Sequence, residues 1–424
     1  MTRIALLAHG TRGDVQPYVA LAARLMEAGF DVSLAAPPNL EAFVRRCEIP
    51  YKRLSGDSQV ILESEQGRRW LSSGNVAAFL KELGDILHDL RHDLDREVQV
   101  ACEGADAIIA QPLTEDRGLI MAEALGVPLL LGNFFPYCRT GAFANPFVTT
   151  SKLPLPMLNR ATYALFDHIW WKGQRPVMNQ MRAQLGLAPE SRSTKRRIYD
   201  RRDPFLHAFS THVLPRPTDW GDEHTVTGYW QLPQALREKL GEAAMPAKLV
   251  DWLAAGPAPI FIGFGSMPVE DPAAILASTI DLARRLQTRI IIGAGWSNLA
   301  DTDLPDEVCL IGSVNHEWLF PQCRAVVHHG GAGTTAASLR AGAPTLICSV
   351  FADQPFWGRR VADLGVGAHI PFRKMSPTGL ESALRDLLRP EVAQRASALS
   401  KRLQQENGID EAVMAIKTHL NDKR

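Results

Sequence analysis

The sequence predicts an α/β protein made of two similar halves, each built on a parallel sheet. Short apolar runs alternate with helical patterns along the whole chain, and a second such series begins at Pro259 with PIFIGFGS. Alternation of this kind is typical of strand–helix–strand units, whose strands run parallel. A length of 424 residues also fits two domains.

The first half opens with a clear strand–loop–helix unit. A strand is expected at 4–8 and a loop from His9 to Asp14. In the helix that follows, Tyr18, Leu21, Ala22 and Leu25 fall on one face. Gly29 closes that helix. Further strands are predicted at 31–35, 107–110, 128–132 and 206–214.

The second half repeats the pattern without a close sequence repeat. Its expected strands are 259–263, 289–293, 308–311, 325–328 and 345–350. Residues 215–246 are rich in proline, glycine and polar residues and read as the linker. We therefore expect an N-terminal domain at 1–230, a C-terminal domain at 231–405 and a charged C-terminal helix at 406–424, which by pattern alone is a surface helix.

Composition excludes several classes of protein. Lys plus Arg and Asp plus Glu number 46 each, so no overall field favours nucleic acid. The six cysteines are scattered without a C-x-x-C pair, as in a reduced cytosolic protein. The apolar segment at 4–8 is too short for a signal peptide, and no apolar run reaches the roughly 18 residues that span a bilayer. A cytoplasmic location is expected, with peripheral membrane contact left open.

A glycine-rich strand end at 325–340, AVVHHGGAGTTAASLR, predicts an anion-binding site. Glycines follow His329 where the backbone must turn, and Thr334 and Thr335 open a helix. Free N–H groups and the positive end of the helix dipole favour a diphosphate, to which the hydroxyls can add hydrogen bonds. A tight turn without a ligand is the alternative. His328 precedes His329 on a strand, so it points to the opposite side and is expected to be structural.

Five motifs, in chain order, resemble the nucleotide-sugar glycosyltransferases of family 1. They are TRGDVQPYVALAARL at 11–25, GFGSM at 263–267, HEWLF at 316–320, HHGGAGTT at 328–335 and FADQPFWG at 351–358. The likeness is strongest to sterol 3-beta-glucosyltransferases and to bacterial glycosyltransferases that modify antibiotic aglycones. The resemblance implies the GT-B fold, in which two Rossmann-like domains face each other across a cleft. The donor then lies against the C-terminal half, the acceptor enters under the N-terminal half, and the C-terminal helix returns to the first domain.

The resemblance also implies the donor site. The pyrophosphate is held by His329, Gly331, Ala332 and Gly333, with Thr334 and Thr335 adding contacts. An imidazole there can donate a hydrogen bond and carry positive charge as the leaving group gains negative charge. Other implied donor-side residues are Arg12, Gly13, Gly265, Ser266, Trp296, Ser313, Val314, Asp353 and Gln354.

Individual roles follow from the same resemblance. Ser266 contacts phosphate or sugar, and Asp353 and Gln354 bind the hexose hydroxyls. Trp296 either stacks on the uracil or merely packs, and Arg12 either orients substrate or is an exposed loop arginine. Plant members carry a glutamate for the ribose where this chain has Ala337, which leaves UDP-sugar and TDP-sugar donors both open. Sterol-type members share the small residue, which favours UDP-glucose.

Asp14 is the candidate catalytic base, together with His329 as a catalytic residue at the donor. It occupies the place where plant relatives carry a catalytic histidine, and a carboxylate there can take the proton of an acceptor hydroxyl as its oxygen attacks the sugar. From position alone, an N-cap role for Asp14 is the rival interpretation.

The implied reaction is a single in-line displacement with inversion that needs no metal and no cofactor beyond the sugar nucleotide. The chain has no clustered His, Cys or Asp set at metal-ligand spacing. For the acceptor, an apolar aglycone such as a sterol or polyketide suits the aromatic residues after the strand at 128–132. The expected acceptor contacts are Asn133, Phe134, Phe135, Tyr137 and Phe143.

A basic stretch at 191–203 offers two interpretations. Its charges are Arg192, Lys195, Arg196, Arg197, Arg201 and Arg202. A solvated surface is the ordinary explanation, and attachment to anionic lipid is the alternative.

Three other functions are disfavoured. An epimerase of the same fold would leave the aromatic acceptor half and HEWLF without a role. An oxidoreductase would need G-x-G-x-x-G after the first strand, where GTRGD stands instead. A silent sugar-nucleotide binding module would not need both Asp14 and His329.

Overall fold

The computed structural model describes residues 1–57, 60, 64, 76–151, 153–264, 272–293, 304–312 and 314–422. Within these ranges the chain divides into two compact units. The first contains Met1–Ile61 and Val76–Leu240 together with the C-terminal segment from Asn407, and the second contains Leu62–Asn75 and Gly241–Glu406. The division falls a short way beyond the expected boundary at residue 230.

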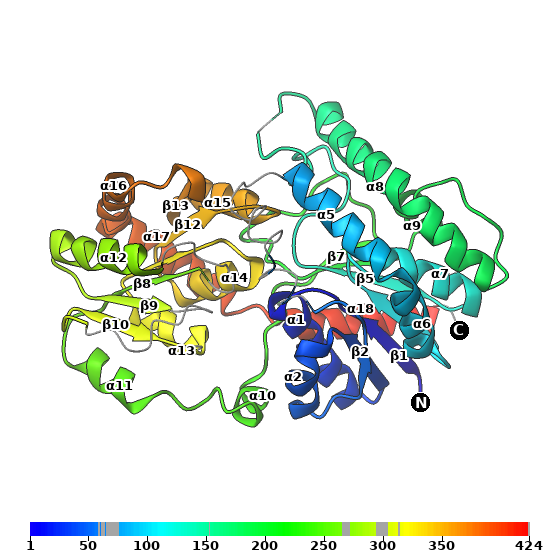
Figure 1. The fold of residues 1–424 in the computed structure, drawn as a ribbon, viewed down its shortest axis with the longest axis horizontal. Helices are drawn as coiled ribbons and strands as arrows, with labels where there is room; N and C mark the ends of the chain where they lie inside the picture. The colour runs from blue at the N-terminus through cyan, green and yellow to red at the C-terminus, as the bar shows by residue number, and fades with distance from the viewer. Residues whose placement is uncertain are drawn as a thin grey trace. The chain divides into compact units, whose positions relative to one another are not determined.

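The first unit is a parallel α/β layer structure (Figure 1). Its described residues form a seven-stranded sheet of order β3-β2-β1-β4-β5-β6-β7. The strands are β1 (Arg3–Leu7), β2 (Asp31–Ala36), β3 (Tyr51–Arg53), β4 (Ala107–Ala110), β5 (Leu129–Asn133), β6 (Phe205–His207) and β7 (His224–Val226). The helices are α1 (Arg12–Glu27), α2 (Glu41–Arg46), α5 (Val76–Asp89), α6 (Arg91–Cys102), α7 (Glu115–Leu125), α8 (Pro156–Gln184), α9 (Thr194–Arg201), α10 (Gln234–Lys239) and α18 (Gly408–Asp422).

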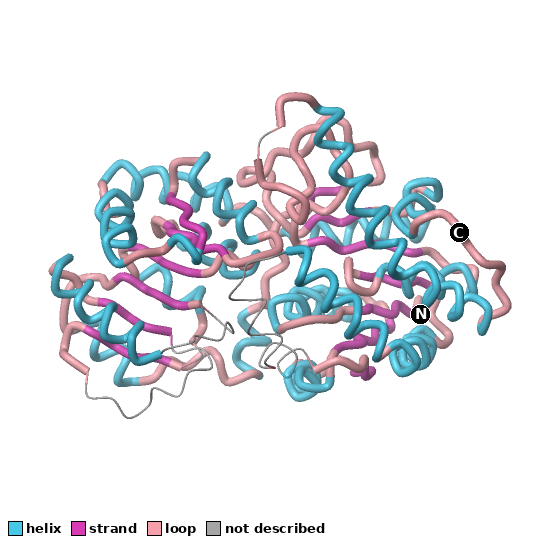
Figure 2. The backbone as a smooth tube through the Cα atoms, turned by 45° about the horizontal axis from the view of Figure 1, so that its top comes forward, coloured by secondary structure: helices cyan, strands magenta, loops and turns pink. Residues whose placement is uncertain are grey.

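The second unit repeats this architecture with a six-stranded sheet of order β10-β9-β8-β11-β12-β13 among its described residues. The strands are β8 (Ile260–Gly263), β9 (Ile290–Gly293), β10 (Val308–Ile311), β11 (Ala325–His328), β12 (Thr345–Ser349) and β13 (Gly367–Pro371). The helices are α11 (Ala247–Ala254), α12 (Pro272–Leu286), α13 (His316–Leu319), α14 (Ala332–Ala341), α15 (Gln354–Asp363), α16 (Pro377–Leu387) and α17 (Pro390–Leu403). Figure 2 shows helices on both sides of the strands in each unit.

Burial explains why the central strands are continuous apolar runs. Strands β4, β5, β8, β11 and β12 are buried at every position. A parallel sheet with helices on both faces has no solvent side, so its strands lose the alternating pattern of a half-exposed sheet. The two predicted Rossmann-like halves are therefore both present.

Strand order places a topological switch point in each unit. The order reverses between β1 and β4 in the first unit and between β8 and β11 in the second. Open α/β sheets bind ligands outside the carboxyl ends of the strands at such points. The loop after β1 and the loop after β11 are thus the positions that the fold favours for chemistry.

Two of the differences from the sequence predictions concern the bounds of an element. The loop expected to run to Asp14 ends at Thr11, and α1 begins at Arg12. The strand expected at 206–214 is only Phe205–His207. The C-terminal segment forms α18, which packs on α1, where Asp410 Oδ1 accepts a hydrogen bond from Arg24 Nε at 2.5 Å. A search of the described helices found none with the length and apolar character to cross a membrane.

Candidate functional site

The loop after β11 reaches α14 through two glycines with different tasks. Gly330 has φ +96°, and a Cβ there would lie 2.5 Å from Ile347 Cγ2, so both its conformation and its surroundings exclude a side chain. Gly331 is the N-cap of α14. At Gly333, in the first turn, an added Cβ would meet no atom of the described residues within 4 Å. Among those residues, nothing covers this position of the helix.

His328 is a structural residue of this loop, as expected. It is fully buried, and its Nδ1 accepts a hydrogen bond from the Gly330 N–H at 2.9 Å. Its Nε2 lies 3.4 Å from Ser338 Oγ. Burial lowers the pKa of His328 well below its usual value, so the ring is neutral and holds the loop in place.

His329 and Thr335 each carry a buried polar atom with no hydrogen-bond partner among the described residues. These atoms are Nδ1 of His329 and Oγ1 of Thr335. Desolvation lowers the pKa of His329 to about 4. A buried polar atom left unpaired costs about 1 to 3 kcal/mol, so native structures rarely keep one without a reason. An anionic ligand at the start of α14 would give both atoms a partner.

The loop after β12 lies against the same turn. Gln354 is buried, and its Oε1 accepts hydrogen bonds from the N–H groups of Val350 at 2.9 Å and Phe351 at 3.3 Å. Asp353 Oδ2 accepts from Trp357 Nε1 at 2.7 Å. A Cβ on Gly330 would come within 3.3 Å of Gln354 Cβ, which places the two loops side by side. The two residues predicted to bind the hexose thus also hold their own loop.

The remaining donor predictions are placed unevenly. Ala332 and Thr334 are half-buried in the first turn of α14, and Val314 packs at the edge of a core that includes Ala337. Ala337 is 9% exposed and supplies no polar group for a ribose. Gly265, Ser266, Trp296 and Ser313 lie outside the described residues.

Asp14 caps α1, but not in the way expected. The N-cap is Thr11, and Asp14 is the third helical residue, whose Oδ2 accepts hydrogen bonds from Thr11 N at 2.8 Å and Thr11 Oγ1 at 2.9 Å. This reciprocal arrangement is a capping box. The N-cap interpretation of Asp14 is therefore wrong in position, although the residue does cap the helix.

The carboxylate of Asp14 is half-buried beside the loop backbone. A Cβ at Gly10, where φ is +127°, would lie 2.5 Å from Asp14 Oδ2, so glycine makes room for the carboxylate. Burial raises the pKa of Asp14, and the two Thr11 hydrogen bonds oppose that rise. A raised pKa suits a group that has to take up a proton.

The residues near Asp14 differ in burial and in their hydrogen bonds. Arg12 Nε donates to Gln16 Oε1 at 3.1 Å, and the guanidinium stacks over Phe43 at 4.6 Å, so the expectation of a loop arginine is wrong. Gly13 is exposed. His9, which sequence reasoning did not single out, is buried at the end of β1 with Nε2 2.8 Å from the Ser55 carbonyl oxygen.

The predicted acceptor residues follow β5 but split into two groups. Phe134 is buried and meets Tyr18 and Trp230 edge to face, so it belongs to the core under the sheet. Phe135 and Tyr137 start a second group, a chain of aromatic rings that passes through Phe147 and Phe166 to Trp170. Phe143 is half-buried. Asn133 is fully buried, and its Oδ1 has no partner among the described residues.

The basic stretch is mostly neutralised by carboxylates. Lys195 and Arg197 are buried, and they pair with Glu115 at 2.6 Å and with Glu123. Other ion pairs in the stretch join Arg192 to Glu190, Arg201 to Asp203 and Arg202 to Glu223. Lys195 and Arg197 thus do not belong to a solvated face, whereas the other basic residues of the stretch, Arg192, Arg196, Arg201 and Arg202, are exposed.

Around Lys195 lies a buried ionic cluster that the sequence did not reveal. A small cavity there is lined by Glu115, Asp116, Tyr137, Asp167 and Trp170, among others. Burial raises the pKa of Glu115 to about 7, with Lys195 opposing the rise, and raises that of Asp167 to about 6. This cluster lies at the Tyr137 and Trp170 end of the aromatic chain.

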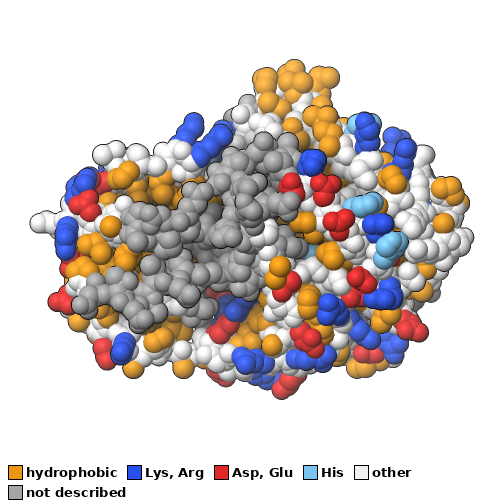
Figure 3. Space-filling view, viewed as in Figure 1, with side chains coloured by type: hydrophobic (Ala, Val, Ile, Leu, Met, Phe, Trp, Pro, Cys, Tyr) orange, Lys and Arg blue, Asp and Glu red, His pale blue; other side chains and the backbone are white. Residues whose placement is uncertain are grey.

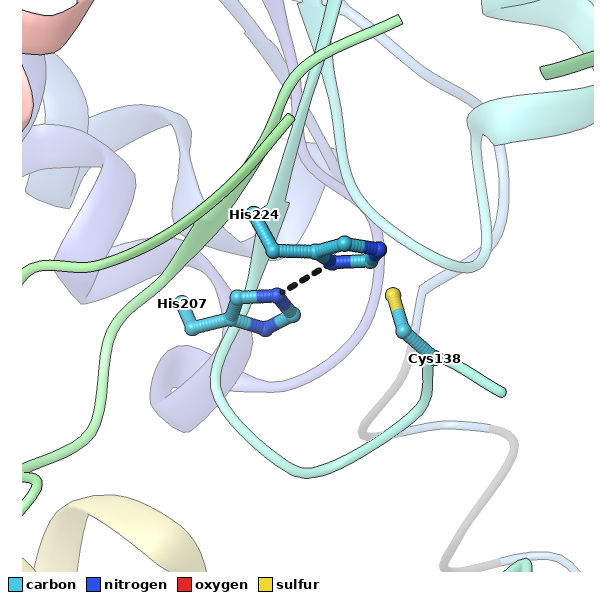
Figure 4. Close-up of side chains that lie close together, drawn as sticks. All are labelled: Cys138, His207 and His224. Carbon is cyan, nitrogen blue, oxygen red and sulfur yellow. Dashed lines mark hydrogen bonds between the residues drawn. The ribbon is translucent and has the colours of Figure 1, made fainter. Parts of the chain in front are cut away.

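Three potential metal ligands also meet in the first unit: Cys138, His207 and His224 (Figure 4). Their ligand atoms lie within 4.8 Å of one another, and all three residues are buried. His207 Nε2 and His224 Nδ1 are already hydrogen-bonded at 3.0 Å, and Trp220 stacks on both rings. These three residues are far apart in the sequence, so their spacing there does not predict a metal site. The sheet order β5-β6-β7 brings them together in the fold.

Two family models match the chain. Residues 4–144 match the glycosyltransferase family 28 N-terminal domain, and residues 277–416 match the erythromycin biosynthesis protein CIII-like C-terminal domain. The first match contains Asp14, and the second contains the whole loop from His328 to Thr335.

Relatives align over almost the full chain. Two sterol 3-beta-glucosyltransferases of Arabidopsis thaliana, UGT80A2 and UGT80B1, are 37% and 36% identical over 99% of this chain, which covers 66% and 68% of their lengths. A sterol 3-beta-glucosyltransferase of Neurospora crassa is 35% identical, and the chain spans 27% of it. The chain thus corresponds to about two thirds of the plant relatives and a much smaller part of the fungal one.

Solved structures share the fold at low identity. A glycotransferase of kitacinnamycin has a TM-score of 0.72 and 18% identity, with 99% of both chains covered. The glycosyltransferase VinC, in complex with DTDP, has a TM-score of 0.70 and 18% identity over 100% of both chains. With two Rossmann-like units, the motifs in order and these relatives, the chain belongs to the nucleotide-sugar glycosyltransferases of family 1 with the GT-B fold.

Proposed function

We propose that the protein is an inverting, metal-independent hexosyltransferase that moves glucose from UDP-glucose to a hydroxyl of a hydrophobic acceptor such as a sterol. The observation that carries this proposal is the start of α14, where two buried polar atoms, on His329 and Thr335, have no partner among the described residues. A sugar-nucleotide diphosphate supplies what they lack, because its oxygens accept hydrogen bonds from N–H and O–H groups.

In the proposed donor complex, the free N–H groups of the first turn of α14 face the diphosphate. The helix dipole favours the negative charge, and the Thr335 hydroxyl donates to a phosphate oxygen. His329 is neutral without ligand, since its pKa is about 4. A nearby dianion raises that pKa, so the ring gains a proton or donates a hydrogen bond as negative charge develops on the leaving diphosphate.

Fewer residues of this chain support the proposed sugar and base of the donor than support the diphosphate. Asp353 and the amide nitrogen of Gln354 are the proposed hexose contacts, next to Gly330. UDP is proposed over TDP because Ala337 is small, as in sterol-type members. TDP-sugar is the alternative, and the complex of VinC with DTDP is its support.

In the proposed reaction the acceptor oxygen attacks the anomeric carbon of the sugar. The new carbon–oxygen bond forms as the bond from that carbon to the diphosphate oxygen breaks, and the configuration inverts. Asp14 takes the acceptor proton, and UDP leaves with the electron pair. The base is typically worth ~10²- to 10⁴-fold in rate. No metal is assigned a role, since His329 and α14 are proposed to absorb the charge.

The acceptor is proposed to be lipophilic because of the aromatic chain from Phe135 to Trp170. Ring centroids along it are 5.4–6.4 Å apart, so a flat apolar molecule has several rings to contact. The plant and fungal relatives are sterol 3-beta-glucosyltransferases, which supports the same class of acceptor.

A donor and acceptor panel tests the proposal. The purified protein is incubated with UDP-glucose or TDP-glucose and with sterols, macrolides or phenols, and products are read by mass spectrometry. The expected result is one added hexose on a sterol, with UDP released only when the acceptor is present and unchanged by EDTA. Donor turnover without an acceptor would instead indicate epimerisation or hydrolysis. Transfer from TDP-glucose alone would replace the UDP assignment.

A further inference from the structure

The long helix α8 carries an apolar surface that the proposed reaction does not use. Among the described residues, thirteen large hydrophobic side chains are exposed, and six of them fall between residues 148 and 169. They are Val148, Leu155, Met157, Leu158, Leu165 and Ile169. Figure 3 shows hydrophobic side chains gathered where the first turns of α8 lie in Figure 1. We call these six residues the α8 patch.

The α8 patch is an arrangement that a helix in water normally avoids. Met157 is 69% exposed and Ile169 59% exposed, while Asn159 and Gln174 on the other side are buried. Residues 157, 158, 161, 165 and 169 recur at helical spacing, so they form one stripe on the outer face. Contiguous exposed apolar surface of this kind marks a contact with a protein or with a membrane.

Charge distinguishes the two kinds of contact. The exposed positions of α8 include Lys172 and Arg175, together with Arg160, which pairs with Asp219 at 2.7 Å, and they include no carboxylate; the one acidic residue of the helix, Asp167, lines the buried ionic cluster. Apolar residues therefore run into cations along the same face. An anionic bilayer satisfies both, since lipid tails accept the apolar stripe and headgroups attract the cations. A second copy of this face would bring like charges together.

We infer that the α8 patch docks on an anionic membrane surface, with Leu165 and Ile169 entering the headgroup region and Lys172 and Arg175 contacting lipid phosphates. Docking through the α8 patch requires no rearrangement of the fold, because its residues are already exposed outside the core. The same helix turns Phe166 and Trp170 toward the aromatic chain. If the proposed function holds, the docked face and the proposed acceptor wall share this helix.

Vesicle co-sedimentation tests the inference with the intact protein. We expect binding to phosphatidylcholine vesicles that contain phosphatidylglycerol, and weaker binding to phosphatidylcholine alone. The variant Leu165→Ser/Ile169→Ser should lower the partition coefficient by about tenfold or more, since burial of two large aliphatic side chains is lost. The variant Lys172→Ser/Arg175→Ser should remove most of the preference for anionic lipid.

Matched controls keep the test sharp. Val100→Ser/Met414→Ser removes two side chains of similar exposure, 51% and 55%, from α6 and α18, and Arg196→Ser removes one exposed charge of the basic stretch. Both should bind vesicles like the wild type, and circular dichroism checks that every variant is folded. Absence of wild-type binding overturns the inference, as does equal binding by Leu165→Ser/Ile169→Ser. Dimers in light scattering that this variant dissociates, without vesicle binding, would assign the patch to a second copy instead. None of these readouts depends on glycosyl transfer.

Discussion

The loops after β1 and β11 both follow a central strand and both open a helix at a topological switch point, yet they satisfy their polar groups differently. After β1, Asp14 accepts two hydrogen bonds from Thr11, and His9 lies within hydrogen-bond distance of the Ser55 carbonyl. After β11, His329 Nδ1 and Thr335 Oγ1 are buried without described partners. A loop whose polar groups are all hydrogen-bonded within the protein has its conformation fixed without a ligand. A loop with unpaired buried polar groups can still form hydrogen bonds to a ligand. The difference separates the loop that carries the proposed base from the loop that is proposed to bind an anion.

The largest expected effect is on catalytic rate and concerns Asp14, in the loop after β1. Asp14→Asn keeps an oxygen that can accept from the Thr11 N–H but removes the basic carboxylate, so kcat should fall by ~10²- to 10⁴-fold while UDP affinity stays the same. Steady-state kinetics with the best acceptor and calorimetry with UDP measure the two quantities. In the wild type, the raised pKa of Asp14 predicts that kcat/KM declines on the acid side at a pH above the usual carboxyl range. Full activity of Asp14→Asn would leave the residue only its capping role.

Alanine substitutions at Gly330 and Gly333, after β11, should separate the effect of backbone strain and crowding from the effect of blocking the proposed ligand site. Gly330→Ala adds a Cβ 2.5 Å from Ile347 Cγ2 at a φ of +96°, so it should lower the free energy of unfolding by about 2 to 4 kcal/mol. Gly333→Ala adds a methyl group into open space inside a helix and should raise stability by about 0.5 to 1 kcal/mol.

Urea unfolding measures both changes. Because the methyl group at Gly333 would stand where the diphosphate is proposed to lie, that stable variant should still bind UDP more weakly. Unchanged UDP affinity in Gly333→Ala would contradict a ligand over the first turn of α14.

Two threonines give the smallest and most direct contrast. Thr335→Val removes a buried hydroxyl without a described partner, so stability should be unchanged or rise by up to about 1 kcal/mol, while the Kd for UDP rises about tenfold or more. Thr11→Val removes half of a capping box and should lower stability by about 1 kcal/mol without affecting UDP. Thermal unfolding and calorimetry on the two variants check the opposite signs. Equal destabilisation of both would mean that the two loops do not differ as described.

The loop after β11 could be predicted from the sequence because its residues are contiguous. Glycines, histidines and threonines between 328 and 335 carry the strand end, the turn and the helix start within eight positions. The capping box after β1 also stands in the sequence as Thr11 followed three residues later by Asp14, but polar residues at this spacing are equally typical of a loop. Helix starts are the least reliable boundaries when loop and helix share polar residues.

Contacts that depend on strand order could not be predicted. Lys195 meets Glu115, and Cys138 meets His207 and His224, only after β5, β6 and β7 align. The basic stretch therefore looked exposed in the sequence and is largely paired in the structure. The exposed apolar stripe of α8 could not be distinguished from a buried one, because an outward-facing apolar stripe and an inward-facing one have the same helical period.

Titration of His329 tests the central claim most directly. With the imidazole signals of wild type and His329→Gln compared by nuclear magnetic resonance, the ring should titrate near pH 4 without ligand, because burial disfavours its charged form. UDP should raise that pKa, so that protons are taken up on binding and the wild type gains affinity relative to His329→Gln as pH falls from 7. An identical His329 titration with and without saturating UDP would contradict the account.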